Sequence, residues 1–182
     1  MKKAFNRNIV TACLMMIVMA FATNFTAQSQ ELAARKHGTV LEQIKLANIN
    51  NTRRDKIREM LDYAFTFKGA RYRSGSSSPK GFDCSGFTSY IFRQFGYTLH
   101  RSSSGQIANG RRVERDDLRP GDLVFFNGRS VGGRIGHVGI VTEVGDKDFK
   151  FIHSASSVGV TESKSTEPYY QRRYVGACRV LE

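Results

Sequence analysis

The sequence predicts an α+β domain in which N-terminal helices pack on a central antiparallel sheet. Three observations support this prediction: helical spacing of apolar residues between residues 52 and 95, short strand patterns from residue 122 onward, and turn residues between those patterns. Because the helices come before the strands instead of alternating with them, the sheet is expected to be antiparallel. The 182 residues, of which 40% are hydrophobic, suffice for one domain with a real core.

Residues 1–27 have the pattern of a secretory signal peptide. Their apolar run, residues 9–22, is shorter than the roughly 20 apolar residues that a membrane span needs. The run follows a basic start formed by Lys2, Lys3 and Arg7. We therefore expect export to the periplasm, the cell envelope or the extracellular space, with a retained N-terminal anchor as the alternative.

Cys13 lies inside that apolar run, in a string that resembles a lipoprotein cleavage box. Most of the run follows Cys13, so we interpret this cysteine as part of the signal peptide. Residues 28–51 are polar and weakly patterned, which indicates a linker that leads into a short helix or strand. The folded domain is expected over residues 52–182.

The first helix of the domain is predicted from residue 52 to about residue 68. Thr52 can cap its N-terminus, and Asp55 lies in the first turn, where negative charge suits the helix dipole. Gly69 is a natural stop for this helix. One apolar face is formed by four residues at helical spacing, namely Ile57, Met60, Leu61 and Ala64.

A second helix is predicted over residues 83–95, after a loop rich in Gly, Ser and Pro. Asp83 is a suitable N-cap residue, and Gly96 ends the pattern. The face that we expect to be buried consists of Cys84, Phe87, Ile91 and Phe95. Cys84 is therefore expected at the inner edge of a helix N-terminus.

Five strands are predicted in the second half of the chain. Their apolar and β-branched runs are separated by turn residues such as Asn127-Gly128 and Gly145-Asp146. The predicted strands cover residues 122–126, 137–144, 149–153, 158–161 and 174–181.

Cys84 has the setting of a catalytic nucleophile. A thiolate attacks far better than a thiol, and the unpaired N–H groups of a helix N-terminus make a cysteine more acidic. Gly81 lets the preceding backbone turn sharply, and Gly86 allows close approach to the first turn. The alternative is a buried structural cysteine. Cys178, the other cysteine outside the signal peptide, is not expected to pair with Cys84, because their settings differ.

Two histidines in predicted strands are candidates for the rest of a catalytic set. His137 can act as a base near neutral pH, and its flanking glycines allow another group to come close. Adjacent antiparallel strands would place His153 beside it, where His153 can fix the tautomer and direction of the first ring. Each histidine alone also fits a surface position. Zinc bound by both histidines and Cys84 is a further alternative, although the close ligand pairs of most zinc sites are missing.

Three strings together resemble the NlpC-type cell-wall peptidase family: Gly-Phe-Asp-Cys-Ser-Gly-Phe at residues 81–87, Gly-His-Val-Gly-Ile at 136–140 and Phe-Ile-His-Ser at 151–154. The resemblance extends from about residue 53 to the C-terminus. It implies a papain-like fold and hydrolysis of peptide bonds in peptidoglycan, typically next to γ-D-glutamate, without a metal or a cofactor. The nucleophile, the base and the orienting residue that it implies are Cys84, His137 and His153.

The resemblance assigns further residues to the cleft. Tyr72 matches a tyrosine near the reacting carbonyl, and the backbone N–H of Cys84 is expected to help stabilise the oxyanion. The residues expected to hold the stem peptide are Asp83, Ser85, Arg101 and Ser103. The family often has Pro, Trp and Gly where this chain has Arg71, Ser74 and Ser76, which leaves the shape of that cleft wall open.

The formal net charge of +12 predicts affinity for anionic partners, with solubility alone as the other explanation. Because export disfavours nucleic acid, we expect a monomer that binds peptidoglycan peptides and an anionic wall or membrane surface. The expected activity is that of an exported cysteine endopeptidase that hydrolyses the γ-D-glutamyl–diamino acid bond. The alternatives are a papain-like N-acetylmuramoyl-L-alanine amidase and a non-catalytic wall-binding module.

Overall fold

The computed structural model describes residues 39–182, and the signal peptide predicted for residues 1–27 lies outside the described residues. Backbone contacts divide the chain into two compact units, Met1–Asn51 and Thr52–Glu182. Among the described residues, no helix is both long enough and apolar enough to cross a membrane.

In the first unit, residues 39–51 are helical, so the expected linker is a helix in its described part. This segment contains neither Gly nor Pro, and it includes the strong helix formers Leu, Glu, Gln, Lys and Ala. Its larger apolar side chains are 50–55% exposed. Because this helix has no buried apolar face, the spacing of its apolar residues does not predict it.

The second unit begins with residues 52–65, which are helical as predicted but end three residues early. Met60 and Ala64 are fully buried, and Ile57 packs partly buried against the same core. These positions confirm the predicted apolar face. A turn follows and includes Gly69, whose φ of 86° suits a residue without a side chain.

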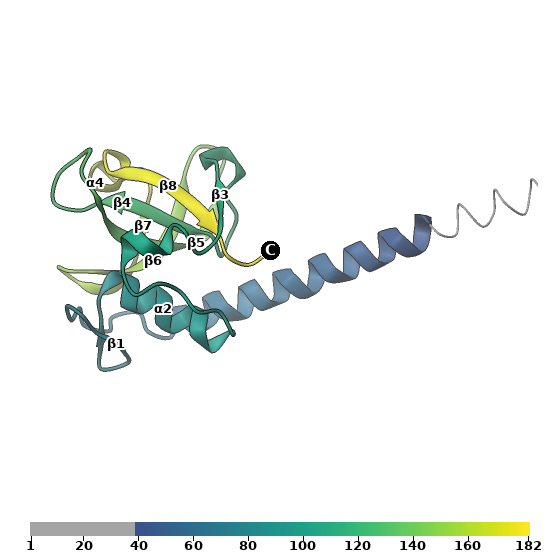
Figure 1. Cartoon of the computed structure of the whole chain (residues 1–182), viewed down its shortest axis with the longest axis horizontal. Helices are drawn as coiled ribbons and strands as arrows, with labels where there is room; N and C mark the ends of the chain where they lie inside the picture. The colour runs from purple at the N-terminus through teal and green to yellow at the C-terminus, as the bar shows by residue number, and fades with distance from the viewer. Residues whose placement is uncertain (1–38) are drawn as a thin grey trace, which may run out of the picture. The chain divides into compact units, whose positions relative to one another are not determined.

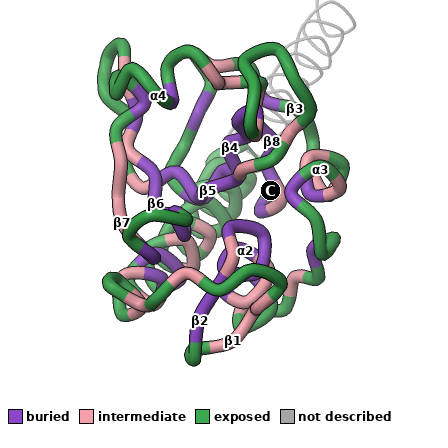
Figure 2. Tube along the Cα trace, turned by 90° about the vertical axis from the view of Figure 1, so that its left-hand side faces the viewer, coloured by how far each residue is buried: buried purple, intermediate pink, exposed green. Residues whose placement is uncertain are grey.

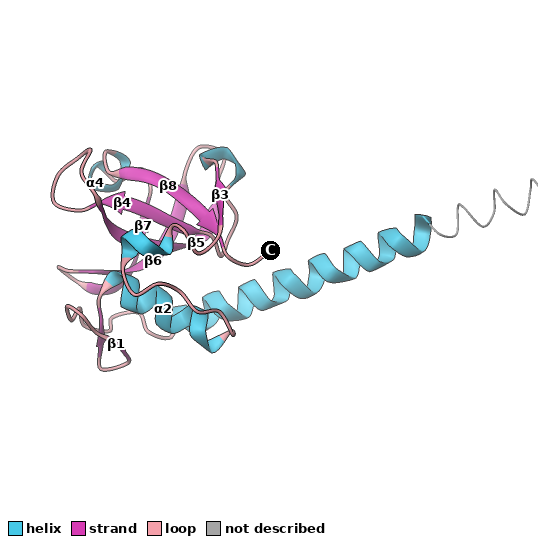
Figure 3. Ribbon diagram, viewed as in Figure 1, coloured by secondary structure: helices cyan, strands magenta, loops and turns pink. Residues whose placement is uncertain are grey.

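Helix α2, Cys84–Gln94, confirms the second predicted helix (Figure 3). The Oδ1 atom of Asp83 accepts a hydrogen bond of 2.6 Å from the N–H of Gly86, so Asp83 is the N-cap as predicted. The predicted inner face is also confirmed, because Phe87 and Ile91 are fully buried.

The sheet has six strands in the order β3-β8-β4-β5-β6-β7, and every neighbouring pair is antiparallel (Figure 1). The strands are β3 Arg111–Val113, β4 Leu123–Asn127, β5 Ile135–Val144, β6 Phe149–Ala155, β7 Gly159–Lys164 and β8 Tyr174–Arg179. The five predicted strands are all present, with ends within three residues of the prediction. Strand β3 is missed because it is a three-residue edge strand with two exposed arginines.

Several short elements connect these parts. They are the hairpin strands β1 Ser77–Ser78 and β2 Gly81–Phe82, the helices α3 Ser103–Gln106 and α4 Pro168–Gln171, and the 3₁₀ turn η1 Arg115–Asp117. The hairpin leads directly into α2, and α4 precedes β8.

The sheet is buried on both faces. In β4, Leu123 and Phe125 belong to the apolar cluster that includes α2, whereas Val124 and Phe126 belong to a second cluster with Tyr170 of α4. Figure 2 shows buried stretches in α2 and in the central strands. This packing holds β5 and β6 between two apolar clusters.

Candidate active site

The thiol of Cys84 lies at the first residue of α2 and against the start of β5. The side chain is 9% exposed, and Sγ lies 3.8 Å from the carbonyl oxygen of Gly136. Interactions with the backbone N–H groups of Ser85, Val138 and Cys84 lower the pKa of the thiol. Because Gly136 and Val138 flank His137, the sulfur touches the backbone that carries the predicted base.

The acidity predicted for Cys84 is not found in this structure. Burial raises the pKa of the thiol, the charge of Asp83 raises it further, and the backbone hydrogen bonds lower it without cancelling the rise. The local signals of a helix N-terminus were identified correctly, but burial outweighs them. The thiol is therefore protonated at neutral pH and donates to the carbonyl of Gly136.

His137 and His153 contact each other across β5 and β6. Nε2 of His137 lies 2.8 Å from Nδ1 of His153, and the two ring planes are inclined at 87°. His153 is fully buried, and its other nitrogen, Nε2, lies 3.3 Å from the hydroxyl of Tyr170. The three side chains thus form a continuous chain of hydrogen bonds.

Both histidines are neutral at pH 7. Burial lowers the pKa of His137 to about 4, and burial followed by the charge of His137 lowers the pKa of His153 well below 6.5. A neutral imidazole has one donor and one acceptor nitrogen. When His137 donates from Nε2 to His153, its Nδ1 is left unprotonated, as a general base requires.

Glycines let the backbone close around these groups, as the sequence predicts. A Cβ atom on Gly86 would lie 2.1 Å from the carbonyl oxygen of Ser76. A Cβ atom on Gly139 would lie 2.5 Å from Cδ2 of Phe151 and 3.1 Å from Cβ of His153. A side chain at either position would therefore displace α2 or the β5–β6 pair.

Asp83 and Arg101 form an ion pair beside the thiol. The Nη2 and Nη1 atoms of Arg101 lie 2.6 and 3.0 Å from the carboxylate oxygens of Asp83, and Nη1 lies 3.0 Å from the Ser85 hydroxyl. Burial raises the pKa of Asp83, but hydrogen bonds from Arg101, Gly86 and Gly75 outweigh burial and lower it. These predicted substrate-binding residues therefore also hold one another in place.

Tyr72 belongs to the same cluster of charged and polar groups. Burial and then the charges of Cys84 and Asp83 raise the pKa of its phenol, while a hydrogen bond with Ser74 and the charge of Arg101 lower it. The pKa of the phenol therefore depends on the charge of Cys84. Ser74, which stands where the family often has Trp, lowers this pKa more than Arg101 does.

Ser103 is the predicted site residue that the structure does not connect to the others. It is buried in α3, and no hydrogen bond within residues 39–182 joins its side chain to the rest of the site. Its neighbour Gln106 has the larger role: Oε1 accepts from Thr88 at 2.7 Å, and Nε2 donates to the carbonyls of Ser85 and His100. Gln106 therefore ties the loop before α3 to α2.

Tyr170 and the backbone of Gly136 and Val138 are parts of the site that sequence reasoning missed. Tyr170 lies on a four-residue helix, and no local pattern separates it from Tyr169. Backbone donors and acceptors carry no signal of their own in a sequence, although the glycine at position 136 indicates a close approach.

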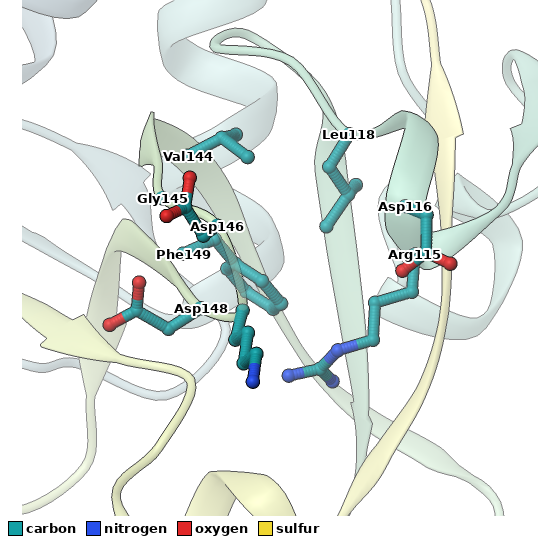
Figure 4. Close-up of a pocket in the computed structure, with 9 residues that line it drawn as sticks. Arg115, Asp116, Leu118, Val144, Gly145, Asp146, Asp148 and Phe149 are labelled. Carbon is teal, nitrogen blue, oxygen red and sulfur yellow. The ribbon is translucent and has the colours of Figure 1, made fainter.

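A separate hollow of about 130 Å³ lies between η1 and the β5–β6 hairpin (Figure 4). Its lining includes charges of both signs, among them Arg115 and Asp146, together with Phe149. None of the predicted site residues lines it. In the described part of the chain, no group of three His, Cys, Asp or Glu side chains is arranged to hold a metal ion.

A cysteine at the start of a helix, packed against an antiparallel sheet with paired histidines on neighbouring strands, defines a papain-like cysteine hydrolase. The chain belongs to the NlpC/P60 family, whose model matches residues 69–179. This membership confirms the family resemblance, the papain-like fold and the assignment as a cysteine peptidase.

Sequence similarity to known proteins covers most of the chain. It is 39% identical over 181 residues to the murein DD-endopeptidase MepS/murein LD-carboxypeptidase of Escherichia coli K12, covering 96% of this chain and 92% of that protein. A crystal structure of an NlpC/P60 family protein from Bacillus cereus is 34% identical with a TM-score of 0.62, over 69% of this chain and 40% of that longer chain. The NlpC/p60 domain of the peptidoglycan hydrolase SagA is 27% identical with a TM-score of 0.55, over 66% of this chain and 95% of that domain.

Proposed function

We propose that this protein is an exported peptidoglycan hydrolase that cuts stem-peptide bonds. Cys84 is the nucleophile, His137 is the base and His153 orients the base. The proposal rests above all on the 2.8 Å contact between the two histidines beside the N-terminus of α2. Export is supported by the signal pattern of residues 1–27 and by the position of the wall outside the cytoplasm.

Catalysis begins when the S–H group of Cys84 turns from the carbonyl of Gly136 to Nδ1 of His137. The S–H bond breaks, Nδ1 takes the proton, and the sulfur attacks the carbonyl carbon of the scissile bond. Collapse of the tetrahedral intermediate breaks the C–N bond, and His137 returns the proton to the leaving amine. Water then attacks the thioester with His137 as base, which releases the acid and the free thiol.

The oxyanion is stabilised by the N–H groups at the start of α2. This role is supported by their position, because N–H groups in the first turn of a helix have no partner within the helix. Tyr72 supplies a further donor: its raised pKa keeps the phenol protonated at neutral pH, so its O–H can donate to the developing negative charge.

Arg101 binds a carboxylate of the stem peptide while it remains paired with Asp83. Its side chain is 48% exposed despite the ion pair, so part of the guanidinium is accessible from the cleft. We also propose that the chain acts as a monomer and that its positive charge holds it to an anionic wall or membrane surface.

The proposal also names the bond that is cleaved. The Escherichia coli relative is named a murein DD-endopeptidase and LD-carboxypeptidase, and this chain covers 92% of its length. That similarity supports the D,D bond that cross-links two stem peptides as the first candidate. The γ-D-glutamyl–diamino acid bond implied by the family resemblance is the second. The amidase alternative is disfavoured by His153, since such enzymes often have Asn or Asp in this role.

The experiment is digestion of purified cross-linked peptidoglycan by the mature protein, with product identification by mass spectrometry. Cleavage of the D,D bond converts cross-linked dimers into monomers with intact stem peptides. Fragments split after D-glutamate support the second candidate, and sugar-free whole stem peptides support an amidase. The hydrolase proposal fails if every product formed by the wild type is also formed by Cys84→Ala, or if the wild type forms none. A binding module would then explain the observations better.

A further inference from the structure

Tyr170 of α4 contacts the histidine pair, and within residues 39–182 no hydrogen bond joins it to Cys84. Tyr170 is 9% exposed, and its hydroxyl lies 3.3 Å from Nε2 of His153. Its ring centroid lies 5.3 Å from that of His153 and 6.2 Å from that of His137. The rings of Tyr170 and His137 are stacked. Because a tyrosine hydroxyl can donate or accept, the direction of this hydrogen bond is coupled to which nitrogen of His153 carries the proton.

We propose that Tyr170 is a positioning residue whose hydroxyl oxygen accepts a hydrogen bond from Nε2–H of His153. This bond selects the His153 tautomer in which Nδ1 is bare and accepts from Nε2–H of His137. The Nδ1 atom of His137 is then unprotonated and can act as the base. The inference rests on the proposed function, in which His137 takes the proton of Cys84.

The opposite direction of the hydrogen bonds gives an inactive base. If Tyr170 donated to Nε2 of His153, the proton of His153 would lie on Nδ1 and would be donated to Nε2 of His137. The neutral His137 would then carry its proton on Nδ1 and have nothing to accept the proton from Cys84. The direction of the hydrogen bond between Tyr170 and His153 thus decides whether His137 can take the proton of Cys84.

The surroundings hold the Tyr170 phenol firmly. Its ring packs at 4.9 Å from Phe151 and 5.2 Å from Phe126, measured between centroids, and Pro168 opens its short helix. Burial raises the pKa of the phenol, whereas an interaction with Ser163 of β7 lowers it.

The titratable and charged groups around this chain of hydrogen bonds come from few elements. His153 faces His137 from β5 and Tyr170 from α4. Tyr170 in turn is near Glu167 and Tyr169 on its own segment. Within residues 39–182, the hydrogen bonds of the two histidine rings join them to each other and to Tyr170, and none goes to a carboxylate, so the tautomers are selected by hydrogen bonds between neutral groups.

The first test reads the tautomers directly in the full chain. Long-range ¹H–¹⁵N correlation of the histidine rings, at about pH 7, distinguishes protonated from bare ring nitrogens. The expected result is a protonated Nε2 and a bare Nδ1 in both His137 and His153. A protonated Nδ1 in His153 would overturn the proposal, whether or not any variant folds.

The second test compares Tyr170→Phe with the matched control Tyr169→Phe, whose tyrosine is 50% exposed. Tyr170→Phe leaves the Nε2–H of His153 without an acceptor, so its ring is expected to switch to the Nδ1–H tautomer. With a wall substrate, kcat is expected to fall about ten- to hundredfold with little change in KM, because an orienting hydrogen bond is lost. Tyr169→Phe is expected to match the wild type.

These outcomes separate the two proposals. Unchanged tautomers and unchanged kcat in a folded Tyr170→Phe protein contradict the positioning role. If the wild type has the expected tautomers, and Tyr170→Phe switches them, but no wall substrate is cut, the positioning role stands and the proposed function fails.

Discussion

Nε2 of His137 lies 2.8 Å from Nδ1 of His153, between rings that belong to neighbouring strands and are 16 residues apart in the chain. Burial keeps both rings neutral at pH 7. A neutral third member fixes the direction and tautomer of the base, but it adds no negative charge to stabilise the imidazolium. Orientation is therefore its main contribution to catalysis.

Replacement of His153 tests this role. His153→Ala removes the acceptor for Nε2–H of His137, and we expect kcat to fall by about 10²- to 10⁴-fold, the range for a triad whose base loses its orienting partner. His153→Asn restores a side-chain carbonyl and is expected to retain more activity than the alanine variant. The exposed residue His100, changed to Asn, is the control, and initial rates on cross-linked muropeptides are the measurement. Equal activity of His153→Ala and the wild type would show that His137 needs no partner.

The ion pair beside the thiol predicts opposite changes in the acidity of Cys84. Asp83→Asn keeps an N-cap oxygen but removes the negative charge that raises the pKa of the thiol, so the pKa is expected to fall. Arg101→Gln removes a positive charge that interacts with the thiolate, so the pKa is expected to rise. The pH dependence of Cys84 alkylation by iodoacetamide measures both. Shifts in the same direction in both variants would contradict this electrostatic account.

Stability is expected to decrease on mild acidification. The folded-state pKa of His137 is lowered from 6.5 to about 4, and that of His153 is lowered as well. The unfolded chain therefore binds more protons between about pH 6.5 and pH 4, and each histidine removes up to about 1.4 kcal/mol of stability per pH unit as the pH falls through that window. Urea unfolding across this range measures the slope.

The comparison for this slope is a variant with both histidines changed to Gln. Its free energy of unfolding is expected to depend less on pH over the same window than that of the wild type. Identical slopes would mean that the two rings take up protons in the folded state as readily as in the unfolded chain.

Gly86→Ala is expected to damage both folding and catalysis. The added Cβ would lie 2.1 Å from the carbonyl oxygen of Ser76, so the first turn of α2 must move away from the preceding loop. Overpacking of this kind costs about 1–3 kcal/mol. Gln94→Ala, at an exposed position on the same helix, is the control, and thermal unfolding with hydrolysis rates is the measurement. A Gly86→Ala protein with wild-type stability and rate would contradict the close approach.

The nucleophile helix was predictable because its signals are local. Asp83 as N-cap, Gly86 in the first turn and the apolar spacing all lie within a few residues, and the structure reproduces each of them. The strands were predictable for the same reason, since β-branched and apolar runs alternate with turn residues. Edge strand β3 lacks such a run, because Arg111 and Arg112 are exposed.

The features that sequence reasoning missed depend on tertiary contacts. The raised pKa of Cys84 follows from burial by elements distant in the chain, and the helix signal alone indicates the opposite direction. Tyr170 joins His153 only because the segment after β7 folds back over the sheet. The role of Arg101 was predicted as a contact to substrate, while its pairing with Asp83 required the folded loop.

Hydrolysis of cross-linked muropeptides by the wild type, Cys84→Ala and Cys178→Ala tests whether Cys84 is the nucleophile. Both cysteines are buried and free, but Cys178 contacts the carbonyl of Gln106, whereas Cys84 contacts the carbonyl of Gly136, the residue before His137. We predict that Cys84→Ala folds and gives no product, whereas Cys178→Ala cuts the same bond as the wild type. Product formation by a folded Cys84→Ala protein at the wild-type rate would rule out Cys84 as the nucleophile, because the reaction would then need no thiol at this position.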